Sequence, residues 1–128
     1  MKTLQKIMCA DDEPGMLMII KLSLENVGGY QVLACASGLE LLDMVDSWNP
    51  DLVILDAVMP GLTGLQTLAR LREKEKGADI PVLFMTGSAG AERENFITAG
   101  AIGVLGKPFD PLRMAEDVGN IWKASQNG

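Results

Sequence analysis

The sequence predicts an α/β fold in which a doubly wound, five-stranded parallel sheet carries helices on both of its faces. Five short apolar runs alternate with longer amphipathic segments along the 128 residues, and strands that alternate with helices form βαβ units and a parallel sheet. The run Leu-Val-Ile-Leu at 52–55 has no polar alternation, which is typical of a central strand that is buried on both faces.

The first strand is expected over residues 4–10, where the chain is mostly apolar. The first helix should begin at Pro14, because the N–H that proline lacks has no partner in the first turn of a helix. A dense apolar stretch at 16–24 continues this helix, which should end near the glycine pair at 28–29. The second strand is expected over 30–36.

The second helix has a start signal and a stop signal. Ser37 and Glu40 match the capping box, in which two side chains satisfy each other's free backbone N–H groups. The apolar residues that follow at helical spacing are Leu41, Val45 and Trp48. The Asn-Pro pair at 49–50 should stop the helix, since proline disfavours a helical residue before it. The third strand then covers 52–55.

The third helix is expected over about 64–76, with Leu65, Leu68 and Ala69 facing inward. The fourth strand should cover 80–85, where Pro81 is tolerated only near the start because it cannot donate to the sheet. A weaker helix over about 91–99 should end at Gly100, the residue type that most often follows a helix in a left-handed conformation.

The fifth strand is expected over 102–105. The pair Asp110-Pro111 then caps the last helix, whose apolar residues Met114, Val118 and Ile121 recur at i, i+4 and i+7. The last five residues, 124–128, are predicted to fray.

Length and composition indicate one domain, 1–128, with its core at about 5–125, because a domain contains ~100–200 residues. No run reaches the ~18 apolar residues that a membrane-spanning helix needs, and the N-terminus has no signal-peptide pattern. The net charge of −6 disfavours binding to a nucleic-acid backbone, which needs clustered cations. We therefore expect a cytoplasmic protein that binds neither membranes nor nucleic acid directly.

The chain contains no histidine, which excludes His-ligated metal sites, Ser-His or Cys-His nucleophile pairs, and phosphohistidine on this chain. Cys9 and Cys35 lie inside predicted strands and match neither a CxxC site nor a zinc pattern. We expect them to be two buried thiols.

Polar residues follow four of the predicted strands, directly or after a single glycine. The groups at these strand ends are Asp11, Asp12 and Glu13 after the first strand, Asp56 after the third, Thr86 with Ser88 after the fourth, and Lys107 after the fifth. In an open α/β sheet, ligands bind beyond the carboxyl ends of the strands. If these strands are neighbours, three carboxylates, a hydroxyl and an ammonium meet in one crevice.

Such a set of groups has a specific chemistry. Clustered carboxylates repel one another unless a cation joins them, and with only oxygen ligands the fitting cation is Mg²⁺. A metal, Lys107 and Thr86 can stabilise the oxygens of an incoming phosphoryl group. One carboxylate is then left to act as a nucleophile and form an aspartyl phosphate.

These residues belong to four motifs: Asp-Asp at 11–12, Asp-x-x-Met-Pro-Gly at 56–61, Thr-Gly at 86–87 and Lys-Pro-Phe at 107–109. With these motifs the chain resembles the receiver (response-regulator) domains of two-component phosphorelays. The resemblance covers about residues 5–125. It implies the strand order 2-1-3-4-5, a flavodoxin-like three-layer sandwich. It also implies that the chain is a signalling domain and not an enzyme. Such a domain takes a phosphoryl group from a histidine kinase or a histidine phosphotransfer protein, and this changes a surface that binds an unidentified downstream protein.

The resemblance also implies roles for single residues. Asp56 would be the phosphoacceptor. Asp12 would ligate Mg²⁺ directly and Asp11 largely through water, with Asp56 and the backbone carbonyl of Val58 completing the protein's ligands. Thr86 would be the switch hydroxyl and Lys107 the phosphate-pairing lysine, joined to Pro108 by a bond that is cis in many relatives. Positions 58 and 88 tune hydrolysis in this family, so the apolar Val58, with Ser88, implies slow loss of the phosphoryl group.

One position departs from the family pattern. Receivers usually have Tyr or Phe three residues before the lysine, and this chain has Val104 there. The signal would then travel through Thr86 and the loop at 87–90. The apolar run at 16–20 is either core with an apolar flank or the surface on which the histidine-bearing donor docks.

Other interpretations remain open at this point. A Mg²⁺-dependent phosphatase of the haloacid-dehalogenase class also uses a strand-end Asp nucleophile, but it needs a second Asp where this chain has Val58. A flavodoxin-like binder or a dinucleotide-binding fold would need a phosphate loop or GxGxxG after the first strand, where 11–13 is acidic. A receiver that serves only as a non-phosphorylated docking module is a third alternative. A stand-alone regulator and the receiver part of a longer protein both fit the sequence.

Overall fold

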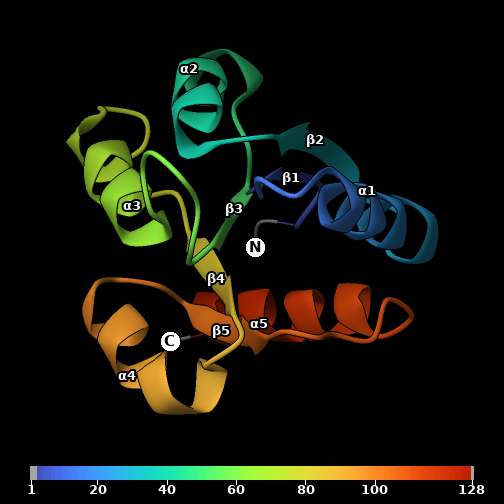
Figure 1. Ribbon diagram of the computed structural model, residues 1–128. Coiled ribbons are helices and arrows are strands. Elements are labelled where there is room, and N and C mark those ends of the chain that lie inside the picture. Colours follow the sequence, from blue (N-terminus) through green and yellow to red (C-terminus); the bar gives the residue numbers. More distant parts are fainter. Residues whose placement is uncertain (1–2, 128) are drawn as a thin grey trace.

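The computed structural model describes residues 3–127 and contains a five-stranded parallel sheet in the order β2-β1-β3-β4-β5 (Figure 1). The fold class predicted from the sequence and the strand order implied by the resemblance are therefore confirmed. The strands are β1 (Lys6–Ala10), β2 (Gln31–Cys35), β3 (Leu52–Asp56), β4 (Val82–Thr86) and β5 (Gly103–Gly106). The helices are α1 (Pro14–Leu22), a π-helical turn η1 (Ser23–Val27), α2 (Gly38–Trp48), α3 (Gly64–Glu73), α4 (Ala89–Thr98) and α5 (Met114–Asn127).

Two apolar clusters lie on opposite faces of the sheet and make the molecule a three-layer sandwich. One joins the sheet to α1 and α5, and the other joins it to α2, α3 and α4 (Figure 1). Every residue of β3 and β4 is buried, as expected for central parallel strands that are covered on both faces. Cys9 and Cys35 are free and buried, and burial raises the pKa of each thiol to about 12. In the part of the chain that the structure describes, no helix has the length and apolar character needed to cross a bilayer.

Several helices differ from the prediction at their ends, and α3 ends at Glu73, about three residues earlier than expected. The first helix leaves α-helical geometry after Leu22 and continues as the π turn η1, where the hydroxyl of Ser23 donates to the carbonyl of Pro111. The last helix is regular through Asn127, so the predicted fraying is wrong for 124–127, while residue 128 lies outside the described part. Trp122 explains this order, because it packs into the core with 5% of its surface exposed.

The inward face of α3 was predicted one position out of phase. Leu68 is buried as expected, but Leu65 and Ala69 are exposed. The buried face consists of Gly64, Thr67, Leu68 and Leu71. Thr67 can occupy an apolar interface because its hydroxyl donates to the Thr63 carbonyl at 2.8 Å, and a buried polar group needs such a partner.

The capping interactions of α2 and α3 also differ from the prediction. Ser37 accepts from the backbone N–H of Glu40 at 3.1 Å as expected, but the Glu40 carboxylate accepts from the N–H of Ala36, not of Ser37. The reciprocal capping box instead begins α3, between Thr63 and Gln66. Both caps fix the start of a helix directly after the loop that follows a strand end.

Candidate functional site

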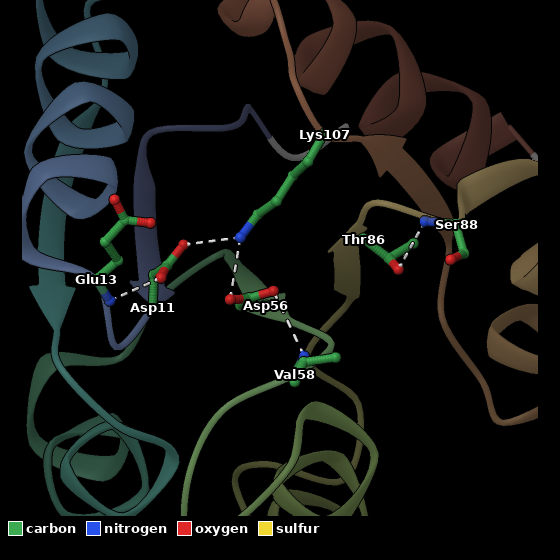
Figure 2. Close-up of polar contacts among 7 residues, drawn as sticks. All are labelled: Asp11, Glu13, Asp56, Val58, Thr86, Ser88 and Lys107. Atoms are coloured by element: carbon green, nitrogen blue, oxygen red, sulfur yellow. Dashed lines mark hydrogen bonds and ion pairs between the residues drawn. The ribbon is translucent and has the colours of Figure 1, made fainter.

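The predicted polar residues converge at the carboxyl ends of the strands. Because β1, β3, β4 and β5 are consecutive neighbours in the sheet, the residues that follow them lie along one edge (Figure 2). Asp11, Asp56 and Thr86 are buried, with 1%, 6% and 4% of their surfaces exposed, and Asp12 is exposed. The site therefore has two deeply held carboxylates and one that faces solvent.

Lys107 connects the two buried carboxylates. Its Nζ lies 3.2 Å from Asp11 Oδ2 and 3.0 Å from Asp56 Oδ2 (Figure 2). Burial disfavours the charged ammonium, but the hydrogen bonds to Asp56 and Asp11 outweigh this effect, so the pKa of Lys107 is raised. The lysine is thus held as a cation, and its ammonium group lies beside the Asp56 carboxylate.

Asp56 is held in an environment that disfavours its charge. Burial raises the pKa of this carboxyl above 3.8, and the negative charge of Asp11 adds to the shift, while the hydrogen bond from Lys107 and the N–H of Val58 oppose it. The Val58 N–H donates to Asp56 Oδ1 over a long distance of 3.5 Å. A second cation at this site would relieve the remaining repulsion.

The backbone around the carboxylates fixes their positions. The N–H of Glu13 donates to Asp11 Oδ1 at 3.0 Å, so Asp11 is oriented by the first residues after β1. After β3, the N–H of Ala57 donates to the carbonyl of Met85 at 2.9 Å. Gly64 lies against this segment: a Cβ at this position would come within 2.6 Å of the Asp56 carbonyl oxygen. Only glycine lets α3 begin this close to the acidic loop.

The donor set fits a hard divalent cation. One carboxylate oxygen from each of Asp11, Asp12 and Asp56 lies within 4.8 Å of the others. Mg²⁺ binds oxygen ligands at ~2.0–2.1 Å and keeps several waters, so small side-chain rotations or one bridging water would bring these oxygens around a single ion. The cluster contains oxygen donors only, which disfavours zinc. The side chain of Val58 is 78% exposed, and the role of its carbonyl as a further ligand stays a prediction.

Thr86 belongs to the same edge but has other partners. Its hydroxyl accepts from the N–H of Ser88 at 3.2 Å and donates to Glu92 Oε2 at 3.3 Å. Among residues 3–127, no hydrogen bond joins the Thr86 side chain to Asp11, Asp56 or Lys107, and Figure 2 shows the hydroxyl turned toward Ser88. The structure thus places Thr86 beside the acidic cluster without connecting it to the cluster.

The remaining predicted residues lie around this edge. Val104 pairs in register with Phe84 and packs, partly buried, against the core on the α2–α4 face. The bond between Lys107 and Pro108 is cis, as the resemblance implied. Helix α4 begins at Ala89, so half of the loop expected at 87–90 is helical.

Sequence reasoning missed two residues that shape the site. In the sequence, Gly64 is only a glycine at the start of a predicted helix, and nothing in the pattern indicates that it lies against the Asp56 backbone. Glu92 follows Thr86 by six residues across a turn, so neither strand nor helix periodicity indicates that the two side chains meet.

Comparison with known proteins identifies this arrangement. The family model described as the response regulator receiver domain matches residues 7–119. The chain belongs to this receiver family. It is 34% identical over 122 residues to the response regulator Rre1 of Synechocystis sp., an alignment that covers 94% of this chain and 52% of Rre1.

Solved receivers have the same fold. The chemotaxis protein CheY4 of Vibrio cholerae superposes with a TM-score of 0.84 at 26% identity, covering 93% of this chain and 99% of CheY4. The receiver domain of the sensor histidine kinase PA1611 of Pseudomonas aeruginosa superposes with a TM-score of 0.80 at 26% identity, covering 95% of this chain and 99% of that domain. That domain has a magnesium ion coordinated in its active site cleft.

The relatives differ in what lies beyond the receiver. The chain spans about half the length of Rre1 and of several other curated relatives that it matches. Several of these are named as transcriptional regulators, one of them as DNA-binding. The expectation that this protein does not contact nucleic acid therefore remains a prediction.

Proposed function

We propose that this receiver takes up a phosphoryl group on Asp56, with Mg²⁺ held by Asp11, Asp12 and Asp56. A carboxylate oxygen of Asp56 attacks the phosphorus of a phosphohistidine on a partner protein. The new P–O bond forms as the P–N bond breaks, and its electron pair returns to the imidazole nitrogen. The product is an aspartyl phosphate, and this chain, which has no histidine, supplies the acceptor and not the donor.

The geometry of Lys107 is the observation that carries this proposal. An ammonium that contacts both Asp11 and Asp56, at 3.2 and 3.0 Å, can pair with a phosphoryl oxygen on Asp56 without moving far. When bound, Mg²⁺ would neutralise charge on the equatorial oxygens of the transferred group. Lys107, together with Mg²⁺ when it is bound, would therefore stabilise the negative charge that develops on the phosphoryl oxygens during the transfer.

Thr86 supplies the remaining group. Its hydroxyl can donate one hydrogen bond to a phosphoryl oxygen, because Thr86 lies at the end of β4, next to β3 and Asp56. In its present position the hydroxyl donates to Glu92 instead. We infer that phosphorylation draws Thr86 toward Asp56 and that this movement carries the signal.

The phosphodonor is proposed to be a histidine kinase or a histidine phosphotransfer protein. Support comes from the surface of α1 and η1, where Met18, Ile19, Leu22 and Val27 expose between 43% and 64% of their surfaces. Exposed apolar side chains that gather on one part of a surface are typical of protein interaction sites. The net charge of −6 supports a downstream partner that is a protein and not a nucleic acid.

The exposed Val58 argues against a phosphatase that acts on free substrates. Such an enzyme would need a general acid two residues after its nucleophile, and Val58 has no titratable group. The bound phosphoryl group should also be hydrolysed slowly, since an apolar side chain at this position cannot orient a water molecule.

A labelling experiment tests the proposal. The protein is incubated with acetyl phosphate and Mg²⁺, and its intact mass is measured. We expect a gain of one phosphoryl group that requires the metal, is lost in hydroxylamine and is absent from Asp56→Asn. Asp43→Asn, at an exposed position on α2, is the matched control and should be labelled normally. Labelling of Asp56→Asn to the wild-type level would place the acceptor elsewhere.

A further inference from the structure

The single proton of the Thr86 hydroxyl is already committed in the unphosphorylated protein. A hydroxyl has one donor, and that of Thr86 points to Glu92 Oε2 at 3.3 Å. The oxygen also accepts from the N–H of Ser88 at 3.2 Å, so both partners hold it on the α4 side of the site. For this proton to reach a group on Asp56, the bond to Glu92 must break.

Glu92 is well placed to keep this bond. It lies in the first turn of α4, and its backbone N–H donates to the carbonyl of Ser88 at 2.9 Å. A carboxylate near the N-terminus of a helix is stabilised by the helix dipole. Across residues 3–127 no cation forms an ion pair with the Glu92 carboxylate. No charged side chain therefore competes with the Thr86 hydroxyl as a donor to this carboxylate.

We propose that Glu92 is a positioning residue for phosphorylation, which holds the hydroxyl of Thr86 away from Asp56 until a phosphoryl group competes for it. This inference rests on the proposed function of Asp56 and Thr86. Two anionic acceptors, the Glu92 carboxylate and the phosphoryl oxygens, compete for one proton. Thr86 can donate to the transferred phosphoryl group only after its hydrogen bond to Glu92 breaks, which slows phosphoryl uptake, and the phosphorylated state loses this hydrogen bond between β4 and α4.

A double-mutant cycle tests the proposal on the full chain. The initial rate of phosphoryl uptake from acetyl phosphate with Mg²⁺ is measured by intact mass for the wild type, Glu92→Ala, Thr86→Ala and the double variant. We expect Glu92→Ala to raise the rate about fivefold when Thr86 is present, the ratio that corresponds to a net hydrogen bond of ~1 kcal/mol. In the Thr86→Ala background the same substitution should change the rate by less than about twofold.

The cycle separates positioning from a general charge effect. Removing a carboxylate also weakens the repulsion of an anionic donor, but this effect would appear equally with and without Thr86. Glu94→Ala, on the exposed surface of the same helix, is the matched control and should leave the rate unchanged. Glu92→Gln keeps an acceptor oxygen without the charge, so its rate should lie between those of the wild type and Glu92→Ala.

The outcomes also distinguish this inference from the proposed function. An equal rate increase in both Thr86 backgrounds, or a larger increase for Glu92→Gln than for Glu92→Ala, overturns the role of Glu92 while the labelling of Asp56 stands. If the wild type takes up no phosphoryl group, the proposed function itself fails and the role of Glu92 fails with it. Denaturant unfolding of each variant identifies any substitution that acts by destabilising the fold.

Discussion

The two halves of the site are built differently. In the acidic half, Asp11 and Asp56 come from β1 and β3 and are joined by Lys107, which follows β5 and lies 96 positions from Asp11 in the chain. In the hydroxyl half, Thr86, Ser88 and Glu92 contact one another within seven residues of sequence. The first half depends on the order of the strands, and the second depends only on one loop and one helix turn.

This difference separates what is fixed from what can move. The acidic half takes its residues from three separate strand ends, so its arrangement depends on how neighbouring strands are placed in the sheet. In the hydroxyl half, rotation of the Thr86 side chain is enough to exchange its hydrogen-bond partners, because both partners lie within six residues of Thr86 in the sequence. A receiver needs both properties, because it must hold a metal and a nucleophile in place while one group nearby responds to the phosphoryl group.

The largest expected effect concerns Mg²⁺ and the acidic half. A ligand that binds only the folded state stabilises it by ~2.7 kcal/mol at one hundred times its Kd. We expect the free energy of unfolding to rise by about this amount with saturating Mg²⁺, and Asp12→Asn to lose most of the increase. Asp12 is exposed, so this variant should fold normally without metal. Denaturant unfolding measures the free energy of unfolding of each protein with and without Mg²⁺. Equal Mg²⁺ stabilisation of Asp12→Asn and the control Asp43→Asn would contradict the proposed ligand set.

Lys107 provides the next test of the acidic half. Lys107→Met removes both ion pairs and leaves two buried carboxylates without a cation, so the free energy of unfolding should fall by about 2 kcal/mol. Because the pKa of Lys107 is raised above 10.5, this stabilisation is complete below pH 10.5 and is lost as the pH rises through the pKa of the folded state. The control is Lys74→Met, which breaks an exposed pair with Asp46 and should cost less than ~1 kcal/mol. Equal costs in the two variants would show that Lys107 is no more important to the fold than a surface lysine.

Asp56→Asn should have the opposite sign. Removing a charge that burial and Asp11 disfavour is expected to raise the free energy of unfolding of the metal-free protein by about 1 kcal/mol at neutral pH. Well below pH 3.8 the carboxyl is protonated in both states and the difference should vanish; it should grow as the pH rises from 3.8 to the raised pKa of Asp56 in the folded protein and stay constant above that pKa. Urea unfolding between pH 4 and 7 measures this, with Asp43→Asn as control. Destabilisation by Asp56→Asn at pH 7 would mean that the Lys107 pairing outweighs burial.

The acidic half was also the part that the sequence predicted best. Asp11 and Asp56 directly follow runs that are apolar enough to identify strands, and Lys107 follows such a run after Gly106. The strand order that the resemblance implied then brings the three residues together. Which of the carboxylates would be buried was not predicted. Asp11 and Asp12 are adjacent, and only the backbone conformation after β1 decides that Asp11 points inward and Asp12 faces solvent.

The hydroxyl half and parts of the helices were predicted less well, for physical reasons. The Thr86–Glu92 contact depends on where α4 begins, and its start was expected two residues later because Ala89 and Gly90 have no helix-start signal. On α3, the buried Thr67 and the exposed Leu65 reversed the apolar pattern, and the Thr67 hydroxyl is satisfied there because it donates to the Thr63 carbonyl. On α3 a side-chain hydrogen bond lets a polar residue face the core, and on α4 no side chain caps the N-terminus, so apolar periodicity alone predicts neither feature.

The smallest expected effect concerns the hydroxyl half. Thr86→Val keeps the shape of the side chain but removes the donor to Glu92 and the acceptor for the Ser88 N–H. The free energy of unfolding should fall by only ~0.5–1 kcal/mol, because Ser88 and Glu92 lie near enough to solvent for water to replace the lost partner. Thr98→Val, at the exposed end of α4, is the matched control and should change the stability by less. A loss of 2 kcal/mol or more in Thr86→Val would mean that this hydroxyl is as firmly built into the fold as Lys107, and a group held that firmly could not exchange Glu92 for a phosphoryl oxygen.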